Sequence, residues 1–399
     1  MKLGKWARLL LAAAPILIGF GAGCGDFWQA PSTTTTCTTN CTTATSGNFY
    51  ILNAGTTPEI VGESIVSGTL TALSGSPWTV EGAPYAMAMA PNGSFLVVSS
   101  TSGVFAYPIT NGTLGTATVV STDQAYAVQV DATDSWLVEA LQGNGGVTLG
   151  AVPISSTTGA NNGSEQTVSF TVANAAVQPN RLVISGDNSN IFAALGTGGT
   201  IVVPFNASAA TGTNPFGTSP KATTIAVANS SGSALSVAVD PSTTPRLFYI
   251  GETLANSAGN SGGLRAFNYS SLGSSALTQA TGSPIASGGL APNFILPIAS
   301  GDDVYVANGA GLSTAGNIAG FAVTASGTTY SIAAGSTVAA GVQPLGLAED
   351  SSSTFVLAVG SLGSPYFDAY TFDTTTVGRL DSQITSSTAA NSIAIVATP

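Results

Sequence analysis

Two glutamates and three arginines are the residues of this sequence whose types and positions could support chemistry. Glu139 in WLVEAL and Glu252 in FYIGET lie at or just after the ends of apolar, β-forming runs, where a charged side chain needs a partner. An arginine can orient a small anionic ligand while a glutamate acts as a base. We therefore predict Glu139, Glu252 and Arg246 as catalytic candidates, and Arg181 and Arg265 as ligand-binding candidates. The alternative is that each charge is a solvated loop residue or part of a structural ion pair.

The residue types that are absent narrow the chemistry further. The chain contains no histidine, and its three cysteines all precede residue 42. These absences exclude Ser-His-Asp and Cys-His nucleophile systems, histidine-ligated metals and a thiol nucleophile in the folded part. No glycine-rich phosphate loop followed by a helix is present either. We expect no cofactor.

Three short acidic segments could suggest bound calcium: DATD (131–134), GDNSN (186–190) and GDD (301–303). A calcium site needs about six to eight oxygen ligands in a defined arrangement. Each segment falls at the expected tip of a hairpin, where Asp, Asn and Gly are favoured by the turn itself. Turn formation accounts for these segments, and we predict no metal site.

The elements that must position these residues are strands. Only 7% of the 399 residues are charged and 44% are hydrophobic, which excludes disorder of the highly charged kind. The 48 glycines and the many serines and threonines suit short strands joined by tight turns, and no long stretch after the N-terminus has a helical period. The net charge of −11 repels phosphate backbones, so nucleic acid is not an expected partner.

The first 23 residues have the pattern of an export signal. Three basic residues precede an apolar run from Leu9 to Phe20, which is short for a membrane span. The following GAGC (21–24) resembles the bacterial lipobox, in which the cysteine is lipidated, although that pattern prefers leucine where Gly21 stands. We expect a lipoprotein signal peptide over 1–23 and a lipid anchor on Cys24 in the bacterial cell envelope, at the outer membrane or the periplasmic face. The alternative is a plain secretory signal and a secreted protein.

Residues 24–46 are predicted to form a tether. The stretch APSTTTTCTTNCTTATSG (30–47) has almost no large apolar side chain and cannot contribute to a core. Cys37 and Cys41 lie four residues apart in it, and an exported pair this close favours a small disulfide loop, with free thiols as the alternative. Two thiols without a nearby histidine make a poor zinc site.

A hairpin pattern recurs along the rest of the chain. It consists of a small residue or proline, about five alternating residues, a polar turn and a β-rich run, as in PYAMAMAPNGSFLVV. Copies begin at residues 84, 125, 179, 234, 292 and 344. Their spacings of 41, 54, 55, 58 and 52 residues leave room for four short strands in each unit. Such a period predicts a β-propeller.

The two ends of the folded part supply a seventh copy. ANSIAIVATP (390–399) is the first half of the hairpin without a second half, and GNFYILNAG (47–55) is the second half without a first. Pairing them would close a ring and leave no sheet edge free. We therefore predict an all-β, seven-bladed propeller of four-stranded blades over residues 47–399. A two-sheet sandwich or an open stack of repeats would not explain the complementary ends.

Several of these segments resemble a known family. VYVANG (304–309) and FYILNAG (49–55) are similar to the Tyr-Val-Ala-Asn strand of bacterial lactonase-like, or YVTN-repeat, seven-bladed propellers. GTLTALSGSP (68–77) and SSALTQATGSP (274–284) resemble the link between blades in that family, so the likeness covers nearly all of 47–399. The family includes 6-phosphogluconolactonase-like enzymes and exported proteins of unknown role. Its lactonases are thought to use a cluster of Arg, Glu and His around the central channel, and the histidine is missing here.

Two functions remain open at this point. The first is an envelope-anchored binding or scaffold protein, monomeric, whose ring face or central channel binds a carbohydrate, a peptide or an envelope protein. The second is a lactonase-like hydrolase, implied by the resemblance, that acts on a sugar lactone through glutamate and arginine at the channel mouth.

Overall fold

Regular structure in this protein is almost entirely β. The computed structural model describes residues 46–143, 145–172, 178–255, 261–274, 276–309, 315–387 and 390–399, and within these ranges it contains 29 strands and the short 3₁₀ helix η1 (Tyr269–Ser271). The predicted all-β class is confirmed.

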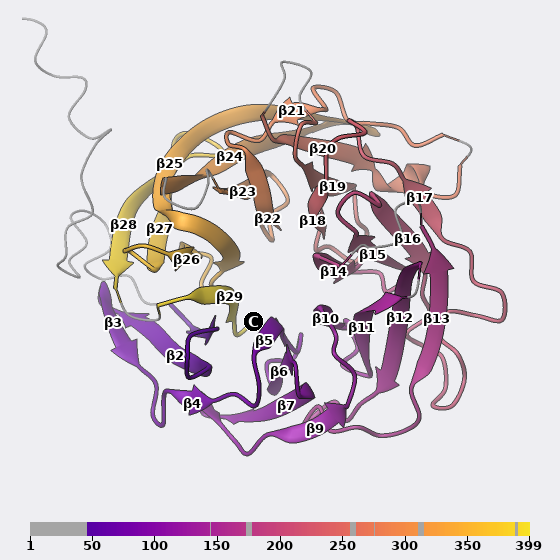
Figure 1. The fold of residues 1–399 in the computed structure, drawn as a ribbon. Helices are drawn as coiled ribbons and strands as arrows, with labels where there is room; N and C mark the ends of the chain where they lie inside the picture. Colours follow the sequence, from indigo (N-terminus) through magenta and orange to yellow (C-terminus); the bar gives the residue numbers. More distant parts are fainter. Residues whose placement is uncertain are drawn as a thin grey trace, which may run out of the picture. The chain divides into compact units, whose positions relative to one another are not determined.

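The strands form seven antiparallel blades arranged in a ring (Figure 1), which confirms the predicted propeller. We number the blades in chain order, beginning with the one that contains β1. Blade 1 contains β29 (Ser392–Ala397), β1 (Asn48–Asn53), β2 (Glu59–Val66), β3 (Thr69–Ala72) and the short β4 (Trp78–Thr79), and blade 2 contains β5 (Pro84–Met89), β6 (Phe95–Ser100), β7 (Gly103–Thr110), β9 (Thr118–Ser121) and the short β8 (Thr113–Leu114). Blade 3 contains β10 (Ala127–Val130), β11 (Trp136–Gly143), β12 (Gly146–Pro153) and β13 (Gln166–Thr171). Blade 4 contains β14 (Arg181–Ile184), β15 (Asn190–Ala194), β16 (Thr200–Pro204) and β17 (Thr223–Ile225). Blade 5 contains β18 (Ala234–Val239), β19 (Leu247–Glu252), β20 (Gly263–Asn268) and β21 (Ile285–Ala286). Blade 6 contains β22 (Ala291–Pro297), β23 (Asp303–Gly309), β24 (Ala315–Ser326) and the first part of the long strand β25 (Thr329–Glu349). Blade 7 contains the second part of β25, β26 (Phe355–Leu362), β27 (Phe367–Phe372) and β28 (Leu380–Ser386).

Each predicted hairpin forms the two innermost strands of a blade. In blades 3 and 7 the polar turn is organised by the aspartate that begins it. Asp131 accepts hydrogen bonds from the backbone N–H groups of Ser135 (2.8 Å) and Trp136 (2.6 Å), and Asp350 does the same for Thr354 (2.9 Å) and Phe355 (2.6 Å). These carboxylates therefore satisfy backbone donors that the turn leaves unpaired.

The ring closes through the strand at the end of the described chain. β29 pairs antiparallel with β1, and Ile51 lies opposite Ile395. The Ser392 hydroxyl donates to Asn53 Oδ1 at 3.1 Å, which joins positions 339 residues apart in the sequence. This pairing is the one that the complementary ends predicted.

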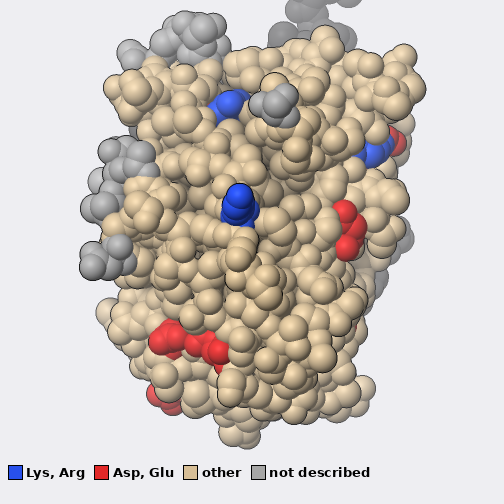
Figure 2. Space-filling model, turned by 90° about the vertical axis from the view of Figure 1, so that its right-hand side faces the viewer, with Lys and Arg blue, Asp and Glu red and all other residues tan. Residues whose placement is uncertain are grey.

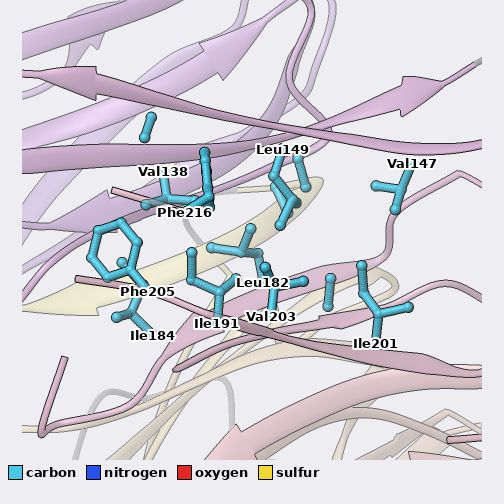
Figure 3. Close-up of a cluster of buried hydrophobic side chains, with 14 of the residues drawn as sticks. Val138, Val147, Leu149, Leu182, Ile184, Ile191, Ile201, Val203, Phe205 and Phe216 are labelled. Atoms are coloured by element: carbon cyan, nitrogen blue, oxygen red, sulfur yellow. The ribbon is translucent and has the colours of Figure 1, made fainter. Parts of the chain in front are cut away.

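The core of the protein lies between the blades. Successive side chains of a strand point to opposite faces, so every central strand contributes apolar groups to both neighbouring blades. Figure 3 shows one such layer, between blades 3 and 4, where Val138 and Leu149 pack against Leu182, Ile191 and Val203. Any charged residue on a central strand must therefore lie in one of these layers.

Candidate functional site

Glu252 and Arg265 form a buried ion pair between blades 4 and 5. Arg265 Nη1 donates to Glu252 Oε1 at 2.8 Å and to the carbonyl of Ala226 at 2.9 Å. The other carboxylate oxygen of Glu252 accepts from the backbone N–H of Ala228 at 2.8 Å. Ala226 and Ala228 belong to the connection from β17 to β18, so the pair ties one blade to the next. Both oxygens of Glu252 are thus engaged in structural contacts.

Arg246 belongs to a hairpin tip. Its Nε donates to Asp240 Oδ2 at 2.7 Å, its Nη2 donates to the carbonyl of Gly301, and its Nη1 lies 4.0 Å from Asp302. Burial alone would raise the pKa of Asp240, but hydrogen bonds from Arg246 and Ser242 outweigh it and lower that pKa. Arg246 therefore fixes a turn and does not meet Glu139 or Glu252 among the described contacts.

Arg181 lies at the centre of the ring. It is the first residue of β14 in blade 4, and its guanidinium carbon lies 4.0 Å from the ring centroid of Phe294 on β22 in blade 6. Blades 4 and 6 are not neighbours, so the side chain reaches past blade 5 on the inner side of the ring. Burial lowers the pKa of Arg181 to about 10, which leaves it cationic at neutral pH. Of the four arginines in the described ranges, Arg181 is the one without a carboxylate partner.

Glu139 lies in the apolar layer between blades 2 and 3, where two further carboxylates meet it. On β11 it shares a face with Leu137 and Leu141, which pack against blade 2. Asp123 follows β9 of blade 2, and Glu165 precedes β13 of blade 3. One carboxylate oxygen from each of the three residues lies within 4.8 Å of the others.

The electrostatics of this carboxylate cluster differ from those of the Glu252 pair. Glu139 is fully buried, and neither of its oxygens has a hydrogen-bond partner among the described residues. Burial, and then the charges of Glu165 and Asp123, raise the pKa of Glu139 to about 8, and the nearby Ser121 hydroxyl offsets only part of the effect. Burial and Asp123 likewise raise the pKa of Glu165. A groove of about 380 Å³ lined by Asp123, Glu165, Ser121 and Asn161 among others opens beside the cluster.

A larger groove of about 650 Å³ lies where blade 1 meets blade 2. Trp78, Phe105, Tyr107 and Glu81 are among its lining residues, none of which is basic. The Tyr107 hydroxyl is buried without a hydrogen-bond partner in the described structure, and burial followed by the charge of Glu81 raises its pKa to about 12. The groove thus offers aromatic faces.

The five predicted residues therefore do not form one site. The structure brings Glu252 and Arg265 together and places Arg246, Arg181 and Glu139 in three other environments. Figure 2 shows one side of the protein, on which the charged side chains are few and lie in small, scattered groups. The partners of Glu139 were missed because Asp123 and Glu165 lie in polar connections. The signal that singled out Glu139, a charge inside an apolar run, does not extend to them.

The predicted signal peptide, the predicted lipid anchor on Cys24 and the predicted Cys37–Cys41 disulfide all fall outside the described residues. Among the described residues, no helix has the length and apolar character required to cross a membrane.

Comparisons with known proteins bear on the fold. No protein-family model and no curated protein matches this chain. A solved structure named as a candidate 6-phosphogluconolactonase from Bacteroides uniformis matches 88% of this chain and 98% of its own, at 18% identity and a TM-score of 0.64. A similarly named protein from Bacteroides fragilis matches 92% and 99% at 15% identity, with a TM-score of 0.64. A periplasmic gluconolactonase from Pseudomonas aeruginosa matches 89% and 100% at 15% identity, with a TM-score of 0.60. At this level of identity the likeness shows the propeller fold.

Proposed function

We propose that this protein is an exported, lipid-anchored propeller that binds a small anionic ligand at the centre of its ring and does not hydrolyse it. The export signal, Cys24 and the threonine-rich tether support anchoring in the envelope. The closed ring completes its own core, which supports a monomer. The low content of basic residues argues against a nucleic-acid partner.

The observation that carries the proposal is Arg181. Its side chain is half-buried, and a cation that has lost part of its hydration is favoured by an opposite charge or by hydrogen-bond acceptors. The face of Phe294 supplies one cation–π contact. No described carboxylate supplies the rest, so the guanidinium is available to a carboxylate or phosphate group, which it matches in geometry. The groove between blades 1 and 2 has no basic lining residue and is a poorer place for an anion.

The absence of hydrolysis is inferred from the surroundings of the acids. A general base must be able to reach the proton that it abstracts. Both oxygens of Glu252 already accept structural hydrogen bonds, and Glu139 is grouped with two carboxylates and no arginine.

A lactonase is the second candidate. The names of the similar Bacteroides and Pseudomonas proteins favour it. Arg181 would then hold the anionic group of the substrate, and a carboxylate would act as the base.

The anion site is tested by titrating gluconate and 6-phosphogluconate into the purified protein by calorimetry. We expect saturable binding that weakens at least about 10-fold in Arg181→Met, because one charge-assisted contact is worth roughly 1.5–3 kcal/mol. Arg379→Met is the matched control, since Arg379 pairs with Asp373 and Asp381 at an exposed position. Equal binding by Arg181→Met and the wild type would refute the site.

Hydrolysis is measured on a panel of sugar lactones, with the spontaneous rate subtracted. We expect no enzymatic turnover. Turnover that disappears in the Glu139→Gln, Glu252→Gln double variant would replace the proposal with a lactonase using those acids. Turnover that survives in the variant would indicate a lactonase with its base elsewhere.

A further inference from the structure

The carboxylate cluster of Asp123, Glu139 and Glu165 has no role in the proposed anion site. Three separate segments contribute to it: the connection from β9 to β10, the middle of β11 and the connection from β12 to β13. Their carboxylate oxygens come within 4.8 Å of one another. Acids held this close repel one another unless something neutralises them.

The surroundings of Glu139 are the strongest indication that another group neutralises this cluster. This residue is fully buried, and both of its oxygens lack a hydrogen-bond partner in the described structure. Buried polar groups are nearly always satisfied, and a buried carboxylate that stays ionised is paired or coordinates a metal.

The other blades show that the position does not need an acid. Equivalent positions in blades 2 to 7 can be matched through one backbone hydrogen bond that recurs at each hairpin turn. In it, an N–H group at the start of the turn donates to the carbonyl of the first residue of the second strand. Three residues after that carbonyl, where blade 3 has Glu139, blades 2 and 4 to 7 have buried aliphatic residues: Val98, Ala193, Ile250, Val306 and Ala358. An aliphatic side chain would fill this place at no electrostatic cost, so the glutamate calls for a functional explanation.

Gly150 provides the room in which the cluster forms. It pairs with Glu139 across β11 and β12, and the three atoms nearest to a Cβ placed on it all belong to Glu165, with Oε1 at 2.0 Å. The equivalent residue in blade 5 is Arg265, because it pairs with Ile250, the counterpart of Glu139. Blade 5 thus carries a fixed cation where blade 3 has a glycine, and the Glu165 carboxylate fills the space that a side chain would take.

We propose that Asp123, Glu139 and Glu165 bind one hard divalent cation, best matched by Ca²⁺, between blades 2 and 3. All three ligands are carboxylates, the donors that Ca²⁺, Mg²⁺ and Mn²⁺ prefer. Ca²⁺ accepts an irregular arrangement of oxygens at about 2.3–2.6 Å, whereas Mg²⁺ requires a nearly regular octahedron, so carboxylates from three separate segments that lie within 4.8 Å of one another suit Ca²⁺ better. Water from the adjoining groove of about 380 Å³ completes the coordination shell.

The test uses the purified protein after treatment with EDTA and removal of the chelator. Ca²⁺ is titrated by calorimetry, and the melting temperature is measured with and without Ca²⁺, with Mg²⁺ for comparison. We expect one Ca²⁺ per chain, weaker Mg²⁺ binding and a higher melting temperature with Ca²⁺. Glu139→Gln should bind Ca²⁺ at least about 10-fold more weakly, because it removes the one fully buried ligand.

Two further variants keep the result interpretable. Gly150→Ala retains all three acids but forces the Glu165 carboxylate to move, so it should also weaken Ca²⁺ binding, even if Glu139→Gln fails to fold. Glu252→Gln is the matched control, because it removes an equally buried acid and should leave Ca²⁺ affinity unchanged. Absence of saturable Ca²⁺ binding by the wild type would overturn the proposal. So would unchanged binding in Glu139→Gln or Gly150→Ala, or an equal loss in Glu252→Gln.

Discussion

Glu139 and Glu252 are two fully buried acids on the second strands of blades 3 and 5, and they differ in the groups that surround their carboxylates. Each faces the preceding blade, close to the connection that enters its own blade. Glu252 meets Arg265 and a backbone N–H, whereas Glu139 meets Asp123 and Glu165. A repeated fold can thus hold a buried carboxylate between blades either with a cation from its own chain or, as we propose, with one taken from solution.

The largest effect on stability is expected when Arg265, the cation that pairs with Glu252, is removed. Arg265→Met should destabilise the protein by about 3–5 kcal/mol, because it leaves Glu252 as a buried charge without its partner. Urea denaturation measures the loss. The double variant Arg265→Met, Glu252→Gln should recover most of it, and failure to recover would mean that Arg265 acts mainly through packing on Phe267 and the Ala226 carbonyl.

A second variant places an arginine in blade 3 at Gly150, the position that Arg265 occupies in blade 5. Gly150→Arg should make the stability of the protein independent of Ca²⁺, because its Cβ displaces the Glu165 carboxylate and its guanidinium would take the place of the metal beside Glu139. For the wild type, Ca²⁺ at 100 times its Kd should add about 2.7 kcal/mol to the free energy of unfolding. Thermal melts with and without Ca²⁺ measure both proteins. A Ca²⁺-dependent gain in the variant as large as that of the wild type would contradict the equivalence of Gly150 and Arg265.

A smaller effect is expected at Asp303, a partly buried acid that makes no salt bridge within the described part of the chain. Its Oδ1 has no hydrogen-bond partner among the described residues, and burial followed by the charge of Asp302 raises its pKa to about 6. A raised pKa in the folded state means that folding disfavours the ionised form, so stability falls as the pH rises from about 4 to 6.

Asp303→Asn should remove that slope and add about 1–2 kcal/mol at pH 7, a figure reduced for partial exposure. Urea denaturation at pH 4, 5, 6 and 7 measures the difference between variant and wild type. A difference that does not grow with pH would show that Asp303 is not the group responsible.

The fold could be predicted from the sequence because the same hairpin pattern recurs along the chain. Each hairpin combines apolar alternation with a turn residue, and the halves at 47–55 and 390–399 determine how the ring closes. The site was less predictable. Glu139 and Glu252 could be identified as charges inside apolar runs, and Asp240 is close enough in sequence to Arg246 for their pairing to be foreseen. The pairing of Glu252 with Arg265, and the approach of Asp123 and Glu165 to Glu139, depend on strand register and on the paths of connections of variable length. No local pattern encodes these.

The pairing of β29 with β1 also constrains when the protein can fold. Blade 1 lacks its innermost strand until residues 392–397 have been made, long after β1 leaves the ribosome. Until then the edge of β1 that will receive β29 stays open, and the ring cannot lock. A nascent chain of this design therefore cannot complete blade 1 until its last strand is available.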